Sequence, residues 1–434
     1  MKTVRIETFG CKVNQYESEY MAEQLEKAGY VVLPDGDVSY YIVNSCAVTK
    51  EVEKKVKRLI KSIRNRNRNA KIILTGCFAQ LSPDEARNLS VDMVLGIDEK
   101  KHIVDHINSL NGKQQVIVSE PGRPVYEKVK GSFEDRTRSY IKVEDGCDNT
   151  CTYCAIRLAR GSKIRSKPLE IFKDEFVEMV AKGYKEIVIT GVNLGKYGKD
   201  MGSSLAELLK VIEKVPGDYR VRLSSINVED VNEEIVEAFK RNPRLCPHLH
   251  ISVQSGSDDV LKRMGRKYRI SDFMRVVDKL RSIDPDFSIT TDIIVGFPGE
   301  TDDDFQKTLD LVEKVGFSRV HIFRFSPRPG TPASRMGGSV PESKKKERLD
   351  VLKEKAKDVS IRYRKRIIGK ERKVLAEWYV MKGILSGYDE YYVKHEFVGD
   401  RVGEFHNVRV KSLSEEGVVS CRADMVEGKI PVRG

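Results

Sequence analysis

Hydrophobic and polar positions alternate with two different periods over the first 110 residues. Compact apolar runs typical of buried strands occupy residues 3–9 (TVRIETF), 40–45 (YYIVNS), 71–76 (KIILTG) and 91–96 (VDMVLG). Stretches with helical periodicity lie between them at residues 16–29 and 49–64, and a third helix is expected to begin near Ser82, with Pro83 in its first turn. Strands that alternate with helices predict an α/β domain with a parallel, doubly wound sheet.

The middle of the chain repeats the strand and helix alternation after a segment rich in glycine, proline and charge, from about Asn111 to Arg138. Six strand-like segments follow, separated by helical stretches: SYIKVE, EIVIT, VRLSSI, HLHISV, SITTDIIV and RVHIF. Six βα units without a closing pair predict a partial (β/α)6 barrel. Its chemistry is expected at the carboxyl ends of the strands.

The last part of the chain changes pattern again. Residues 341–373 form a long, basic helical stretch and linker, and from about Val374 short strands alternate with turns. This pattern predicts a small all-β barrel, which is a common nucleic-acid-binding scaffold. The expected domains are residues 1–112, a linker at 113–132, a core at 133–363 and a terminal barrel at 366–431.

Composition narrows the class of protein. The chain has 434 residues, of which 40% are hydrophobic and 33% charged, and its net charge is +12. No apolar run approaches the roughly 20 residues that span a bilayer, and the start lacks the apolar block of a signal peptide. We therefore expect a soluble cytoplasmic protein whose thiols stay reduced. The positive charge suits a polyanionic partner, although a merely soluble basic protein would also have it.

Three cysteines, Cys147, Cys151 and Cys154, follow Gly146 with the spacing C-x3-C-x2-C. Three close thiolates can bind three irons of a [4Fe–4S] cluster and leave the fourth iron open. A structural zinc site would need a fourth ligand, but no histidine lies between His106 and His248 and no other cysteine is near. An open iron suits the amine and carboxylate of S-adenosylmethionine (SAM), whose reductive cleavage yields a 5′-deoxyadenosyl radical.

Three further cysteines, Cys11, Cys46 and Cys77, each lie one or two residues after one of the first three expected strands. The carboxyl ends of parallel strands share one edge of the sheet, where ligands bind. The three cysteines are therefore expected to converge in space. The alternative is three unrelated buried cysteines, because cysteine is often buried.

Polar residues near the ends of the barrel strands are candidates for contacts with SAM or with the substrate. They are Thr190, Gly191, Asn193, Ser225, Gln254, Ser255 and Asp292. Capping and turn roles are the alternative for these residue types. Arg160 and Arg165 flank the cysteine loop and could bind a carboxylate or phosphate of the substrate, or could be solvated at the surface.

Taken together, these motifs resemble the radical SAM methylthiotransferases over nearly the whole chain. The similarity lies in GCKVNQYESE, NSCAVT, TGCFAQ, GCDNTCTYCAI, ARGSKIRS, HISVQSGSDDVLKRMGRKY, TTDIIVGFPGETDDDF and FSPRPGTPASRM. The terminal barrel is similar to the family's RNA-binding TRAM domain. The resemblance implies a second [4Fe–4S] cluster on Cys11, Cys46 and Cys77, where sulfur is attached. One SAM would methylate that sulfur, and a second SAM would supply the radical.

The residues Lys12–Val13–Asn14–Gln15 are most similar to the branch that acts on threonylcarbamoyladenosine. The resemblance implies methylthiolation of adenine C2 in N6-threonylcarbamoyladenosine at tRNA position 37. The implied partners are the tRNA anticodon loop, SAM, an electron donor protein and a sulfur source. An enzyme for N6-isopentenyladenosine or for a ribosomal protein is one alternative, and a non-catalytic, metal-containing RNA-binding protein is another.

Overall fold

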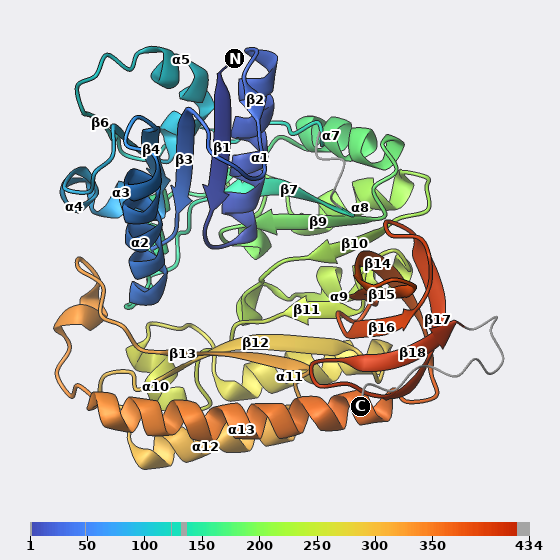
Figure 1. Cartoon of the computed structure of the whole chain (residues 1–434). Helices are drawn as coiled ribbons and strands as arrows, with labels where there is room; N and C mark the ends of the chain where they lie inside the picture. Colours follow the sequence, from blue (N-terminus) through green and yellow to red (C-terminus); the bar gives the residue numbers. More distant parts are fainter. Residues whose placement is uncertain (1, 48, 123, 132–136, 423–434) are drawn as a thin grey trace.

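The computed structural model describes residues 2–47, 49–122, 124–131 and 137–422. The expected boundary at residues 132 and 133 and residues 423–431 of the expected terminal domain lie outside this part of the chain. Among the described residues, no helix is both long and apolar enough to cross a membrane. Figure 1 follows the chain from an amino-terminal sheet, through two further sheets, to a small barrel beside the long helix α13.

The amino-terminal sheet has six parallel strands in the order β2-β1-β3-β4-β5-β6. Its strands are β1 (Thr3–Thr8), β2 (Val31–Val32), β3 (Tyr40–Ser45), β4 (Lys71–Gly76), β5 (Met93–Leu95) and β6 (Gln115–Ile117). Its helices are α1 (Lys12–Lys27), α2 (Lys50–Arg66), α3 (Cys77–Leu81), α4 (Pro83–Arg87), η1 (Asp98–His102) and α5 (Ile103–Asn108). The order β2-β1-β3-β4-β5 is that of a doubly wound sheet of the flavodoxin type.

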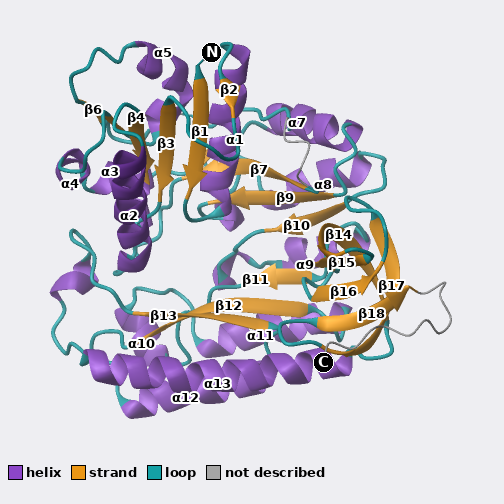
Figure 2. Cartoon of the chain, viewed as in Figure 1, coloured by secondary structure: helices purple, strands orange, loops and turns teal. Residues whose placement is uncertain are grey.

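Helices cover both faces of this sheet, as the alternating pattern predicts (Figure 2). On one face, Met21 and Leu25 of α1 pack with Ile103 of α5. On the other face, Val56 and Ile60 of α2 belong to a second cluster with α3 and α4. Buried parallel strands are apolar on both sides for this reason.

Two boundaries differ from those expected. Strand β1 ends at Thr8, so Cys11 lies three residues beyond it and not two. Strand β6 falls inside the segment expected to be a linker, because Gln115–Ile117 pairs with Met93–Leu95 and extends the sheet by one edge strand. A strand of three residues is too short to give a periodic signal in the sequence.

The middle region contains the six expected strands, all parallel. They are β7 (Arg138–Asp145), β9 (Glu186–Gly191), β10 (Arg220–Leu223), β11 (His248–His250), β12 (Ser288–Val295) and β13 (Arg319–Arg324). They form the sheets β10-β9-β7-β8 and β11-β12-β13, which meet where isolated parallel bridges join Val221 to Leu245 and Ile226 to Ile251. The short β8 (Arg165–Ser166) is antiparallel to β7.

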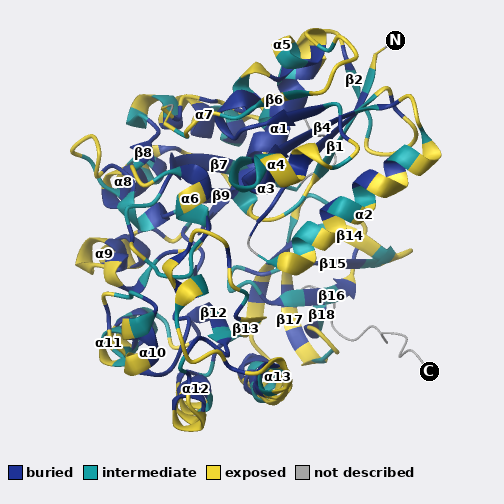
Figure 3. Ribbon diagram, turned by 90° about the vertical axis from the view of Figure 1, so that its left-hand side faces the viewer, coloured by how far each residue is buried: buried dark blue, intermediate teal, exposed yellow. Residues whose placement is uncertain are grey.

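Helices surround these strands and share one large apolar core with them. They are α6 (Ile156–Arg160), α7 (Leu169–Ala181), η2 (Leu194–Lys196), α8 (Leu205–Lys214), η3 (Val228–Asp230), α9 (Glu233–Arg241), α10 (Asp258–Arg263), α11 (Ile270–Ile283), α12 (Asp302–Val315) and η4 (Pro332–Arg335). Figure 3 shows how their outward faces are exposed while the strands between them are buried.

The long helix α13 (Glu342–Arg366) packs along β13 and α12 and leads into a closed barrel with the order β14-β15-β16-β18-β17. The barrel strands are β14 (Glu371–Met381), β15 (Ile384–Tyr388), β16 (Lys394–Val398), β17 (Phe405–Leu413) and β18 (Val418–Arg422). The hydroxyl of Tyr363 donates to the carbonyl of Asp286 at 2.7 Å, which fixes the end of α13 to the middle region.

Candidate functional site

The cysteine loop at residues 147–154 begins where β7 ends. Gly146 has φ +87°, and a Cβ there would lie 2.0 Å from the carbonyl oxygen of Lys163, so only glycine allows this turn. The three cysteines of the loop are half-buried. Burial is the main cause that raises the pKa of the Cys147 thiol to about 12, and the neighbouring thiols of Cys154 and Cys151 contribute in the same direction. The three sulfurs therefore lie close enough to influence one another electrostatically.

The donor set of this loop fits an iron–sulfur cluster. Metal coordination favours the thiolate and so reverses the effect of burial on these thiols. Among the described residues, no group of three or more His, Cys, Asp or Glu side chains is arranged to hold a single metal ion. In a [4Fe–4S] cluster each thiolate binds a different iron, so the ligands need not converge on one point. Three clustered thiols without a fourth protein ligand suit that cluster with one open iron.

Asn193 is placed beside the first of these sulfurs. Its side-chain amide donates to Sγ of Cys147 at 3.5 Å. The backbone N–H of Asn193 donates to the buried carboxylate of Glu144 at 2.6 Å, and the amide of Asn227 donates to its side-chain oxygen at 2.7 Å. These contacts orient the Asn193 amide toward the cysteine loop.

The second cysteine set lies at the carboxyl edge of the amino-terminal sheet. Cys11 is exposed, whereas Cys46 and Cys77 are buried. Gly10 is so close to Cys46 that a Cβ at Gly10 would lie 2.8 Å from its sulfur. Burial raises the pKa of Cys77, the Cys11 thiol acts in the same direction and the Arg160 guanidinium opposes it. The segments that directly follow β1, β3 and β4 thus bring the three cysteines into one region.

A pocket of about 180 Å³ lies where the cysteine loop meets the amino-terminal domain. From the amino-terminal domain it is lined by Thr49, three residues after Cys46, and from the cysteine loop by Cys154. The other lining residues are Tyr153, Ala155, Ile156, Gln254, Asp292, Ile294, Phe323, Arg324, Phe325, Ser326 and Arg328. Two cysteine motifs far apart in sequence therefore border the same cavity.

Two of the expected cofactor-binding residues line this pocket. Gln254 has φ +69°, a strained value for a residue with a side chain. Its backbone N–H and its backbone carbonyl each form a hydrogen bond with β12. Asp292 pairs with His250 at 3.1 Å and accepts from Ser252 at 3.1 Å. Burial opposes ionisation of Asp292, but the contact with His250 outweighs it and the pKa is lowered.

The other expected cofactor contacts are placed differently. Thr190 is buried inside β9, and Gly191 packs so tightly on Glu144 that a Cβ would lie 2.8 Å from its carboxylate. The hydroxyl of Ser255 accepts from the backbone N–H of Ser257 in a buried turn. Ser225 is exposed after β10. Thr190, Gly191 and Ser255 thus have packing or turn contacts within the protein, and their contacts with SAM or the substrate stay a prediction.

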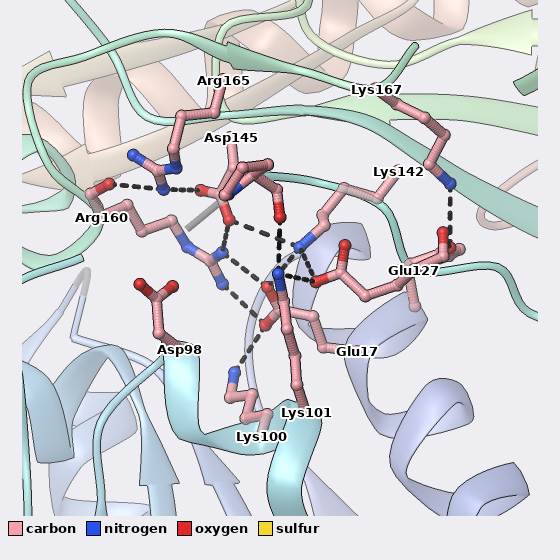
Figure 4. Close-up of polar contacts among 12 residues, drawn as sticks. Glu17, Asp98, Lys100, Lys101, Glu127, Lys142, Asp145, Arg160, Arg165 and Lys167 are labelled. Atoms are coloured by element: carbon pink, nitrogen blue, oxygen red, sulfur yellow. Dashed lines mark hydrogen bonds and ion pairs between the residues drawn. The ribbon is translucent and has the colours of Figure 1, made fainter. Parts of the chain in front are cut away.

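Arg160 and Arg165, expected as substrate ligands, are buried inside the protein (Figure 4). Arg160 contacts Glu17 at 2.7 Å and Asp145 at 3.0 Å. Arg165 donates to the carbonyl of Arg160 at 2.9 Å. The guanidinium of Arg160 bridges Glu17 of α1 and Asp145 of β7 and so helps to hold the two α/β domains together. The guanidinium of Arg165 is bound within the middle region, by the carbonyls of Lys163 and Arg160.

Several pocket residues lack a sequence signal that would have marked them. Phe323 is 37% exposed at the end of β13, and its ring faces the pocket beside Arg324. Arg328 contacts Glu53 of α2 at 2.7 Å and joins the pocket rim to the amino-terminal domain. An aromatic residue in a strand and an arginine in a loop are common, so only the fold shows that they meet.

The chain matches known protein families along two segments. Residues 141–312 match the Radical SAM superfamily, and residues 3–96 match "Uncharacterized protein family UPF0004". The chain is 94% identical over 434 residues, the full length of both chains, to the threonylcarbamoyladenosine tRNA methylthiotransferase MtaB of Thermotoga maritima. It is 36% identical over 424 residues to the protein of the same name from Bacillus subtilis, covering 94% of each chain.

The fold is also similar to a solved radical SAM structure. The methyltransferase TsrM of Kitasatospora setae superimposes with a TM-score of 0.58 at 13% identity, over 77% of this chain and 75% of that chain. At this identity the likeness concerns the fold alone.

Proposed function

The chain belongs to the radical SAM methylthiotransferases, in the branch that acts on threonylcarbamoyladenosine in tRNA, and we propose how its residues divide that reaction. The reaction converts N6-threonylcarbamoyladenosine to its 2-methylthio derivative with SAM as cofactor. The identity of 94% over the full length distinguishes this substrate from isopentenyladenosine and from a ribosomal protein.

The observation that carries the assignment of residues is the shared pocket. Cys154 and Thr49 border one cavity, although they belong to different domains and different cysteine motifs. When bound, a [4Fe–4S] cluster on Cys147, Cys151 and Cys154 supplies the electron that cleaves SAM, and a second cluster on Cys11, Cys46 and Cys77 supplies the site of sulfur attachment. A pocket where the cysteine loop meets the amino-terminal domain suits a substrate base that must meet both clusters.

The pocket residues would bind and orient SAM and the substrate and would exclude water from the site. Asp292, held ionised by His250, offers a carboxylate to hydroxyl or amine groups of the ligand. Gln254 offers an amide from a position fixed by β12 on both sides. The ring of Phe323 offers an apolar face for stacking with an adenine, which both SAM and the substrate contain. Asn193 donates to Cys147 and orients that sulfur.

The terminal barrel is proposed to be a TRAM-like RNA-binding domain that begins at residue 366. The domain before it is proposed to be a radical SAM core at residues 133–363, with an open (β/α)6 arrangement. The proposal is supported by the closed strand order and by aromatic side chains on the outside of β14, where Tyr379 is 54% exposed and Trp378 is 39% exposed. Exposed aromatic rings are stacking platforms for nucleotide bases.

The proposal includes further partners. Cleavage of SAM needs one electron each time, and the product gains a sulfur atom, so an electron donor protein and a sulfur source complete the reaction. We also propose a cytoplasmic location, where thiols stay reduced and tRNA is accessible.

The experiment that tests the function is a nucleoside profile of tRNA from cells with and without the gene, measured by mass spectrometry. Deletion should remove 2-methylthio-N6-threonylcarbamoyladenosine and leave N6-threonylcarbamoyladenosine in its place. Loss of 2-methylthio-N6-isopentenyladenosine, with the threonylcarbamoyl product unchanged, would contradict the substrate assignment. Expression of the intact gene should restore the missing nucleoside.

A further inference from the structure

We propose that one exposed face of α2 binds RNA phosphates next to the nucleotide that enters the pocket. This face consists of Lys50, Lys54, Arg58 and Lys61 and is called here the α2 cationic face. The inference rests on the proposed tRNA substrate and deepens it, because it names a surface that holds the RNA backbone while the base reacts.

The four side chains form a single stripe. They are spaced by four, four and three residues, which places them on one side of a helix with 3.6 residues per turn. Their span is roughly 16 Å along the helix axis. The opposite side of α2 carries Val56, Ile60 and Ile63, which are buried against the amino-terminal sheet. The helix is thus fixed on its apolar side and cationic on its outward side.

Within the described part of the chain, the α2 cationic face forms no ion pair, and Lys50 has Glu342 as an electrostatic neighbour. All four side chains are exposed, and none forms a hydrogen bond or ion pair with a described residue. Two other cations of the same helix are neutralised, since Lys57 pairs with Glu85 and Arg64 with Asp92. The protein therefore supplies carboxylates for Lys57 and Arg64 but leaves the charges of Lys54, Arg58 and Lys61 for an external anion.

The amino-terminal end of α2 lies at the rim of the pocket. Thr49 accepts from the backbone N–H of Val52 as the cap of α2, and the same residue lines the pocket. Glu53 in the first turns is held by Arg328 at 2.7 Å, and Arg328 also lines the pocket. Figure 1 shows α2 reaching past the ends of the parallel strands toward the chain that follows β13.

This placement matches what a base-modifying enzyme needs from its RNA. The target base has to enter the pocket, and the phosphates on either side of it stay outside. A cationic stripe that begins at the pocket rim meets those phosphates, and each neutralised phosphate releases counterions. An acidic electron donor protein would also be attracted to such a face, but it has no need of a stripe that starts at the substrate pocket.

The test compares two triple variants of the full-length, anaerobically reconstituted protein. One variant is K54A/R58A/K61A on α2. The control, K173A/K210A/K214A, removes three exposed cations from α7 and α8 on the other flank of the molecule in Figure 1. The probe is a fluorescent anticodon stem-loop RNA, with fluorescence anisotropy recorded at several salt concentrations. Iron content and the thermal unfolding midpoint confirm that both variants are folded and loaded.

The α2 variant should bind the stem-loop about tenfold more weakly or worse at ~0.1 M salt, and its slope of log K against log[salt] should be shallower by about 2. The control should stay within about twofold of the wild type. Unchanged binding by the α2 variant, or an equal loss in the control, would overturn the proposal. Failure of the substrate assignment is separate, because deletion of the gene would then leave 2-methylthio-N6-threonylcarbamoyladenosine unchanged in the nucleoside profile while the RNA-binding difference remained.

Discussion

The guanidinium of Arg160 lies 2.7 Å from the carboxylate of Glu17 and joins the two cysteine-bearing domains at a buried point. Glu17 is in α1, which begins directly after Cys11, and Arg160 ends α6, which begins two residues after Cys154. Asp145, two residues before Cys147, binds the same guanidinium at 3.0 Å. One arginine therefore ties segments next to both cysteine sets together (Figure 4).

Removing this arginine should destabilise the interface between the domains. In Arg160→Ala, Glu17 and Asp145 lose a buried countercharge, and loss of one partner of a buried pair costs about 3–5 kcal/mol. The free energy of unfolding should fall by that order, as measured by urea denaturation of the loaded protein. Lys163→Ala, which removes an exposed cation from the same loop, is the matched control. Equal midpoints for wild type and Arg160→Ala would show that the pair adds nothing.

The two cysteine sets should separate in their effects on the reaction. Cys147→Ala should abolish SAM cleavage, because it removes a ligand of the cluster proposed to reduce SAM. Cys46→Ala should retain SAM cleavage and lose methylthio transfer. Both are measured by liquid chromatography of 5′-deoxyadenosine and of the tRNA nucleosides. Methylthio transfer by Cys46→Ala would refute the role of the second set, and Cys421→Ala, outside both sets, serves as control.

Asn193 should set the reduction potential of the cluster at the cysteine loop. Its amide donates to Sγ of Cys147 at 3.5 Å, and a hydrogen bond to sulfur stabilises the more negative, reduced state. Asn193→Ala should lower the potential by about 20–60 mV, from a bond of about 0.5–1.5 kcal/mol and a one-electron couple. Anaerobic redox titration followed by electron paramagnetic resonance measures this. A higher or unchanged potential in the variant would contradict the role of the amide.

Glu390 should make stability depend on pH near neutrality. Burial and the neighbouring Asp389 raise its pKa from 4.5 to about 7 in the loop between β15 and β16. The folded protein then binds more protons than the unfolded chain, so the stability from this group is complete below pH 4.5 and is lost as pH rises through 7. The loss is at most about 3 kcal/mol, reduced by solvent screening.

Glu390→Gln removes this titration. Its free energy of unfolding should therefore fall less than that of the wild type between pH 5 and pH 8, measured by urea denaturation at each pH. Glu415→Gln, an exposed residue of the same barrel, shows whether any neutralised carboxylate has the same effect. Parallel pH curves for wild type and Glu390→Gln would refute the prediction.

The sequence by itself determined the class of chemistry and most of the elements. The spacing of Cys147, Cys151 and Cys154 is local, so a single loop fixes it whatever the rest of the fold does. Strand and helix periods located the amino-terminal sheet, the six parallel strands and the terminal barrel, because burial on two faces of a sheet or on one face of a helix leaves a repeating pattern. Cys11, Cys46 and Cys77 could be grouped for the same reason, as residues that follow successive parallel strands.

Only the tertiary structure decided which polar side chains face the cysteine loop and the pocket, and which ones form ion pairs that stabilise the fold. Arg160 and Asn193 were both candidates for ligand contacts, Arg160 because it flanks the cysteine loop and Asn193 because it follows a barrel strand. Burial between two domains gives Arg160 carboxylate partners, whereas Asn193 is turned toward a cysteine sulfur. The pocket formed by Thr49, Gln254 and Phe323 joins residues more than 200 positions apart. Contacts over such separations arise from packing, and no period along the chain records them.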